Sequence, residues 1–106
     1  MIRKAFHAGF QSDIDSIQAH ILDITGDTNA ATLRVREVDA LVKRILDNPL
    51  SGMRLDGKLK GCLRRTGGRD HKIVIVFEPF IEENFVLFLL ASFGGQNWSD
   101  IAKDRL

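Results

Sequence analysis

The sequence contains no tyrosine, one cysteine, one tryptophan and only two prolines among its 106 residues. Without tyrosine, no phenolic hydroxyl is available to donate a proton. Cys62 has no second cysteine to pair with, so an internal disulfide is excluded and a reducing, cytoplasmic environment is expected. We interpret Cys62 as a small filler residue. Cys62 and the scattered His7, His20 and His71 show no metal-ligand spacing, so we predict no metal site and no cofactor.

Long apolar runs are also missing. The longest, Phe85 to Ala91, is too short to cross a bilayer as a helix. The first residues carry two charges without an apolar run behind them, so we expect no signal peptide and no membrane partner. The apolar fraction of 44% favours an ordered globular chain. A chain of this length predicts a single domain over residues 1–106 with one modest core.

Positive charge is concentrated in one segment. Residues 54–72 contain seven basic and two acidic residues, a net charge of +5, whereas the rest of the chain contains eight basic and twelve acidic residues, a net charge of −4. The total of +1 therefore conceals a basic segment on a mildly acidic body. Such a segment places on the surface a patch of charge that suits a polyanion.

Two stretches have the apolar spacing of amphipathic helices. The first stripe is Phe10, Ile14, Ile17, Ile21 and Ile24, and Gly26 ends it. The second is Ala31, Val35, Val38, Val42 and Ile45, in a helix that begins at Asp27 or Thr28 and ends near Asp47, before Asn48 and Pro49. The short link between the two predicts an antiparallel hairpin. We interpret the charged residues of the second helix as a solvated face; these are Arg34, Arg36, Glu37, Asp39, Lys43 and Arg44.

Strand patterns lie on both sides of the hairpin. Residues 2–8 and 63–66 are short candidates, and 72–77 is a β-branched run. A connection over 78–84 leads to the apolar run 85–93, which we expect at the centre of the sheet because both of its faces are apolar. Residues 98–106 predict a short tail helix. The order predicts an α+β domain with an N-terminal strand, a helical hairpin, an antiparallel meander and a C-terminal helix.

Three strings in this order resemble the RelE/ParE superfamily of bacterial type II toxins. "LDNPLSGMRLDGKLKGCLR" is similar to the family's helix end, N-P-x-x-G turn and L-x-G-x-x-R strand start. "GGRDHKIVIVF" resembles its G-x-Y-R-I-x-Y strand, with His71 and Lys72 in place of Tyr-Arg. "VLFLLASFGG", followed by "WSDIAKDRL", resembles its last strand and tail helix. The likeness covers roughly residues 2–106.

The resemblance implies two different activities on one fold. RelE-like members cut mRNA in the ribosomal A site with basic residues around the scissile phosphate and often a tail tyrosine. ParE-like members inhibit DNA gyrase and are not nucleases. A degenerate relative that only binds its antitoxin is a third alternative. The resemblance also implies a cognate antitoxin, whose acidic and apolar segment covers the basic face. We favour the metal-independent, ribosome-dependent endoribonuclease.

The basic residues of the meander are the candidate site. By strand alternation Lys72 shares a face with Val74 and Val76, while Arg64 and Arg65 point to opposite faces, so only one of this pair reaches the site. By the resemblance, Lys72 takes the place of an arginine that stabilises the phosphate. The catalytic candidates are therefore Arg64, Arg65 and Lys72.

The candidates for RNA binding surround these residues. They are Lys58, Lys60, Arg69 and Trp98. Lys58 and Lys60 lie on a glycine-flanked loop and would hold the flanking backbone. Trp98 stands where the tail tyrosine is usual; an indole stacks on a base, or plugs the space beneath the tail helix, but cannot supply a phenolic proton.

Overall fold

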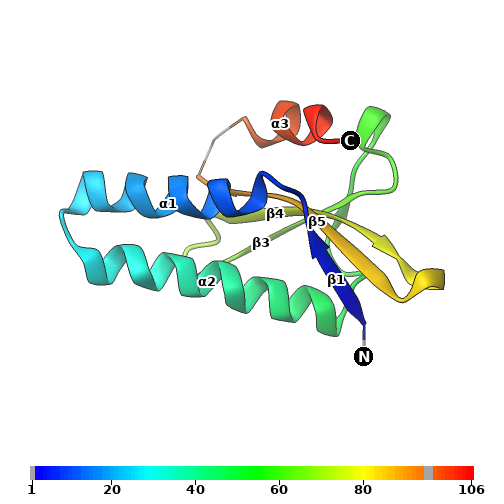
Figure 1. Cartoon of the computed structure of the whole chain (residues 1–106), viewed down its shortest axis with the longest axis horizontal. Coiled ribbons are helices and arrows are strands. Elements are labelled where there is room, and N and C mark those ends of the chain that lie inside the picture. Colours follow the sequence, from blue (N-terminus) through cyan, green and yellow to red (C-terminus); the bar gives the residue numbers. More distant parts are fainter. Residues whose placement is uncertain (1, 95–96) are drawn as a thin grey trace.

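The computed structural model describes residues 2–94 and 97–106 and has the expected α+β order (Figure 1). The hairpin consists of α1 (Phe10–Thr25) and α2 (Thr28–Asp47). The strands are β1 (Arg3–Phe6), β2 (Met53–Arg54), β3 (Leu63–Gly67), β4 (Ile73–Phe80) and β5 (Phe85–Phe93). Short 3-10 turns, η1 (Gly57–Leu59) and η2 (Ile81–Glu83), and the tail helix α3 (Trp98–Asp104) complete the chain.

The hairpin begins and ends where the sequence signals predict. Gly26 ends α1 in the left-handed conformation, with φ of 64°, and its N–H donates to the carbonyl of Leu22. The side chain of Asp27 accepts from the N–H of Asn29 and caps α2. One member of the first stripe was wrongly expected in the core: Ile24 is 61% exposed, because it lies in the last turn of α1, beyond the sheet.

The five strands form one sheet in the order β1-β5-β4-β3-β2. The meander is antiparallel, and β1 adds to β5 in parallel. As expected from its apolar run, β5 is an interior strand, flanked by β1 and β4, although β4 is the middle strand of the five. The predicted connection over 78–84 is too long, since β4 continues to Phe80 and pairs with β5 there. Pro79 is tolerated within the strand because β3 pairs with β4 only as far as Phe77, so the missing N–H breaks no bond to β3.

Two apolar clusters lie on opposite faces of the sheet. The larger packs the hairpin against Ile73, Ile75 and Phe77 of β4; we call this side the hairpin face. The smaller joins Val76, Leu89 and Leu90 to Leu59, Cys62 and Ala102, and we call this side the outer face. Figure 1 shows α3 on the side of the sheet away from α2. Within residues 2–94 and 97–106, the outer face is covered by a short helix and the loop that contains η1.

Candidate nucleic-acid interface

The two adjacent arginines of β3 point to opposite faces, as alternation requires. Leu63 belongs to the hairpin-side cluster, and Gly67 lies against Leu41 of α2, so Arg65 between them is on the hairpin face. There Nη1 of Arg65 donates to Oγ of Ser51 at 2.7 Å. Arg64 lies on the outer face. Of the two candidates, the structure places only Arg64 beside the tail helix.

Arg64 packs against the single tryptophan of the chain. Its Cζ lies 5.2 Å from the ring centroid of Trp98, which is within the range of a cation–π contact. Nη2 of Arg64 approaches Sδ of Met53 at 3.5 Å, while Nε is buried without a partner in the described part of the chain.

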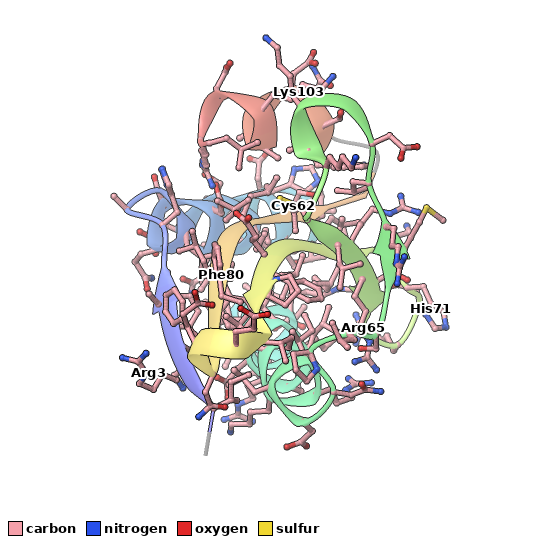
Figure 2. All side chains as sticks on the ribbon, turned by 90° about the vertical axis from the view of Figure 1, so that its right-hand side faces the viewer. Arg3, Cys62, Arg65, His71, Phe80 and Lys103 are labelled. Carbon is pink, nitrogen blue, oxygen red and sulfur yellow. The ribbon has the colours of Figure 1, made fainter. Side chains whose placement is uncertain are left out.

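The loop that carries Lys58 and Lys60 lies next to α3, and Figure 2 shows the two side by side. Leu59 is 2% exposed and anchors this loop in the outer cluster, while the two lysines on either side of it are exposed. The loop thus presents its ammonium groups to solvent beside the helix that carries Trp98. Arg64, the loop lysines and Trp98 form what we call the outer basic site.

Lys72 occupies a different place from the other candidates. It precedes β4 instead of opening it, and its Nζ lies 6.0 Å from the ring centroid of Phe93, a residue of the hairpin-side core. Arg64 pairs in register with Val76, four residues beyond Lys72, so the two backbone positions are roughly 13 Å apart along the strands. At this spacing the two side chains are too far apart along the sheet to be expected on a single phosphate.

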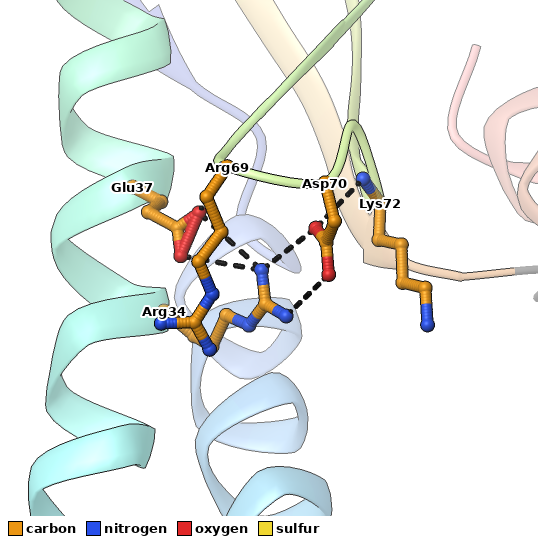
Figure 3. A network of polar contacts seen from close by, with 5 residues as sticks. All are labelled: Arg34, Glu37, Arg69, Asp70 and Lys72. Atoms are coloured by element: carbon orange, nitrogen blue, oxygen red, sulfur yellow. Dashed lines mark hydrogen bonds and ion pairs between the residues drawn. The ribbon is translucent and has the colours of Figure 1, made fainter.

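Arg69 belongs to the turn between β3 and β4, which is tied to α2 by the polar network of Figure 3. Nη1 and Nη2 of Arg34 donate to the two carboxylate oxygens of Asp70 at 2.8 and 2.6 Å. Nη1 also donates to Glu37, whose Oε2 accepts from the backbone N–H of Arg69 at 2.9 Å. The side chain of Arg69 is left exposed. The Arg34 guanidinium holds the pKa of Asp70 far below its ordinary value.

The interpretation of Arg34 as part of a solvated face was wrong. Arg34 is 6% exposed, and its guanidinium lies 4.8 Å from the ring centroid of Phe93. A signal was present in the sequence, since Arg34 follows Ala31 by three residues and precedes Val38 by four, which puts it on the buried stripe. Arg34 orders the turn that carries Arg69 and Lys72, so it supports these candidates from a buried position.

Other sequence expectations concern individual side chains. Cys62 is 2% exposed within the outer cluster, and burial, reinforced by the charge of Glu78, raises the pKa of its thiol to about 11. This environment confirms the filler interpretation. The resemblance to the family's strand predicted that His71 lies on a strand. In the structure His71 instead lies in the turn before β4, with φ of 58°, and is exposed. The described residues contain no group of three histidine, cysteine or acidic side chains placed to hold a metal ion. None of the helices described is long and apolar enough to span a bilayer.

Comparison with known proteins finds structural likeness only. No protein-family model and no curated protein sequence matches the chain. Among solved structures, a chain titled as the chromosomal ParDE TA system from P. aeruginosa superposes with a TM-score of 0.72 at 17% identity, over 89% of this chain and 97% of that one. The isolated E. coli RelE toxin superposes with a TM-score of 0.59 at 12% identity, over the full length of both chains. These matches confirm the fold that the three sequence strings led us to expect.

Proposed function

We propose that this chain, which has the RelE/ParE fold, is the toxin of a type II toxin–antitoxin pair and acts in the cytoplasm as a metal-independent, ribosome-dependent endoribonuclease. The observation that carries the proposal is the outer basic site: Arg64 lies against Trp98 on a face that bears no helix of the hairpin. A guanidinium packed against an aromatic ring suits a phosphate that is followed by a base.

The chemistry of the site is electrostatic. When a 2′-hydroxyl attacks the adjacent phosphorus and the P–O5′ bond breaks, water would take the proton of the 2′-hydroxyl and supply one to the leaving 5′-oxygen. Negative charge accumulates on the phosphorane oxygens in between. Arg64 would stabilise this charge with a guanidinium that is already held in place by Trp98, so little reorganisation is needed. Trp98 would stack on the base beside the cut, and Lys58 and Lys60 would bind the flanking phosphates. Lys72, at the end of the sheet, would contribute charge further along the same strand of mRNA.

The proposed partners follow from the same surface. The mRNA would be bound in the ribosomal A site, and the cognate antitoxin would cover the outer basic site with a flexible segment of acidic and apolar residues. The apolar part has a complementary surface in Leu55 and Met53, which lie beside the site, and Met53 is 57% exposed. The acidic part would neutralise Arg64 and the loop lysines.

Induction of the chain alone in a bacterial host, with pulse labelling of protein and DNA synthesis, tests the proposal. We expect a rapid loss of protein synthesis and mRNA cut within reading frames. A fall in DNA synthesis with an induced damage response would replace this proposal by the gyrase inhibition of ParE-like toxins. No effect on growth would indicate that the protein is a degenerate relative, which binds its antitoxin but has no toxic activity.

The adjacent arginines of β3 provide a matched pair of variants for the site. Arg64→Gln should lower the rate of mRNA cutting by about 100-fold or more, as expected for the loss of a preorganised donor to the transition state. Arg65→Gln should retain the activity, because its side chain faces the hairpin and bonds Ser51. Both proteins should keep their circular dichroism spectra. Full activity of Arg64→Gln, or loss only in Arg65→Gln, would show that the outer face is not the active face.

A further inference from the structure

An ion pair joins the end of α3 to α1 and β5. Arg105, the residue after α3, donates from Nη1 to Oδ2 of Asp13 on α1 at 2.6 Å and from Nη2 to Oδ1 at 2.8 Å. Nη1 also donates to the backbone carbonyl of Leu89 on β5 at 2.8 Å. Oδ2 of Asp13 accepts the N–H of Ala91 on the same strand at 3.0 Å. The end of the tail helix, the first helix and β5 therefore meet at one salt bridge.

The position of this salt bridge follows from the sheet. The strand β1 ends at Phe6, and the last backbone bond on that side of β5 runs from the N–H of His7 to the carbonyl of Phe88. Beyond this point no strand among the described residues pairs with this edge of β5, and Leu89 and Ala91 would leave a carbonyl and an N–H unpaired. Buried backbone groups need partners, and here the two charged side chains supply them.

The pair is largely shielded from water and closely surrounded. The side chains of Arg105 and Asp13 are 15% and 13% exposed. The hydrogen bonds that Arg105 donates to Asp13 raise the pKa of Arg105 above its ordinary value. A Cβ on Gly9 would lie 2.7 Å from Nη2 of Arg105, so the start of α1 has room for the guanidinium only because residue 9 has no side chain. Removing either charge would leave the other without its main partner in a poorly hydrated place.

The tail helix has few other attachments. It contains seven residues, too short to be stable in isolation. Ala102 is its one fully buried side chain, with Trp98 partly buried, while Ile101 is 37% exposed and Leu106 is 57% exposed. Because an alanine buries little apolar area, apolar packing alone gives α3 a weak hold on the outer face. The salt bridge adds a charged link from the residue after α3 to α1 and β5.

We propose that Asp13 and Arg105 form a latch that positions α3 and thereby holds Trp98 against Arg64. They are positioning residues, not catalytic ones, for the outer basic site. The inference rests on the proposed function in so far as it concerns RNA cutting; the placement of Trp98 by the latch is a separate, measurable claim.

The experiment uses four variants of the full chain. Asp13→Asn and Arg105→Gln break the latch, and Arg105→Lys keeps the charge but loses the forked donor. Asp104→Asn is the control, since it makes the same chemical change as Asp13→Asn one residue away from Arg105, at an exposed carboxylate with no ion pair in the described residues. Because the chain has one tryptophan and no tyrosine, its fluorescence reports on Trp98 alone.

Two spectroscopic readouts separate positioning from overall stability. We expect the emission of Trp98 to shift to the red and to be quenched more by acrylamide in Asp13→Asn and Arg105→Gln. We expect amide hydrogen exchange to accelerate in residues 98–106 but not in α2. In the mRNA-cutting assay these variants should lose up to about 100-fold in rate, as for a misplaced reacting group, with a partial recovery in Arg105→Lys.

Either of two results would overturn the latch. Emission, quenching and exchange unchanged from the wild type in both latch-breaking variants would show that apolar packing suffices to place α3. Equal acceleration of exchange in α2 and α3 would show that the salt bridge contributes only to global stability. If the wild-type chain cuts no mRNA, the proposed function fails, but fluorescence and exchange still decide whether the latch places Trp98.

Discussion

Arg34 and Arg36 are two positions apart on α2, yet one is buried against Phe93 and the other is exposed. The difference lies in their partners. Arg34 faces Asp70 across the turn between β3 and β4 and bonds both of its oxygens, so the guanidinium enters the interior with its charge compensated. Arg64 and Arg65 differ in the same way, one reaching Trp98 and the other Ser51. At the residue scale, the available partner decides what a cation does.

Cys62 gives a prediction about pH. Its pKa is raised from 9.0 to about 11 in the folded protein, so the folded state holds the thiol proton more tightly than the unfolded state does. The contribution of the protonated Cys62 thiol to the free energy of unfolding is therefore complete below pH 9 and is lost as the pH rises toward 11. At about 1.4 kcal/mol per pKa unit, the free energy of unfolding should fall by about 2–3 kcal/mol through this titration.

Urea denaturation of the wild type and of Cys62→Ala at pH 8, 9, 10 and 11 measures this loss. The difference in free energy of unfolding between the two proteins isolates Cys62, because the other groups that titrate in this range are common to both. A difference that stays constant from pH 8 to pH 11 would contradict the buried, protonated thiol.

The turn between β3 and β4 is the element that connects the sheet to α2. Gly68 has φ of 85°, and a Cβ there would lie 2.4 Å from Oε2 of Glu37. The same carboxylate accepts from the N–H of Arg69 and from Arg34. The turn therefore fits closely against the polar network of Figure 3, and its shape sets the positions of Arg69 and Lys72.

Gly68→Ala tests this fit against Gly26→Ala. Both glycines have positive φ, but a Cβ on Gly26 would have no atom within 4 Å. Gly26→Ala should cost about 1 kcal/mol of unfolding free energy for the backbone strain alone. Gly68→Ala should cost about 2–3 kcal/mol, because the displaced Glu37 adds to the strain. Chemical denaturation of the two variants measures the difference. Equal losses of unfolding free energy would mean that Glu37 moves away from the added methyl group at no cost.

On the scale of the whole molecule, charge is distributed unevenly. The segment 54–72 has a net charge of +5, and the rest of the chain has −4. Part of this asymmetry lies at the surface of the folded protein, since Lys58, Lys60 and Lys72 are exposed. Asp70, one of the two acidic residues in the basic segment, forms an ion pair with Arg34 of α2. Pairing of Asp70 with a residue outside the segment leaves the segment's own cations uncompensated.

Salt dependence of RNA binding tests this distribution. If Lys58, Lys60, Arg64 and Lys72 each contact a phosphate, the logarithm of the affinity for single-stranded RNA should fall with the logarithm of salt concentration with a slope of about −3. The double variant Lys58→Gln/Lys60→Gln should reduce the magnitude of this slope by about 1.4. Fluorescence anisotropy over a salt series measures both.

The double variant Arg36→Gln/Arg44→Gln is the matched control for this titration. It removes two cations from α2, in the hairpin layer, and should leave the slope unchanged. A slope that falls equally in the two double variants would indicate that RNA responds to the net charge of the molecule instead of the outer basic site.

The sequence by itself determined the elements, because helical spacing, stop signals such as Gly26 and Pro49, and β-branched runs act over a few neighbouring residues. It also determined that the side chains of Arg64 and Arg65 point to opposite faces of the sheet, since the alternation of side chains along a strand is a local property. Only the tertiary structure decided which of them faces Trp98, that Arg34 is buried with Asp70, and that Asp13 meets Arg105. The last two contacts join residues 36 and 92 positions apart, and no local pattern specifies a partner at such a distance.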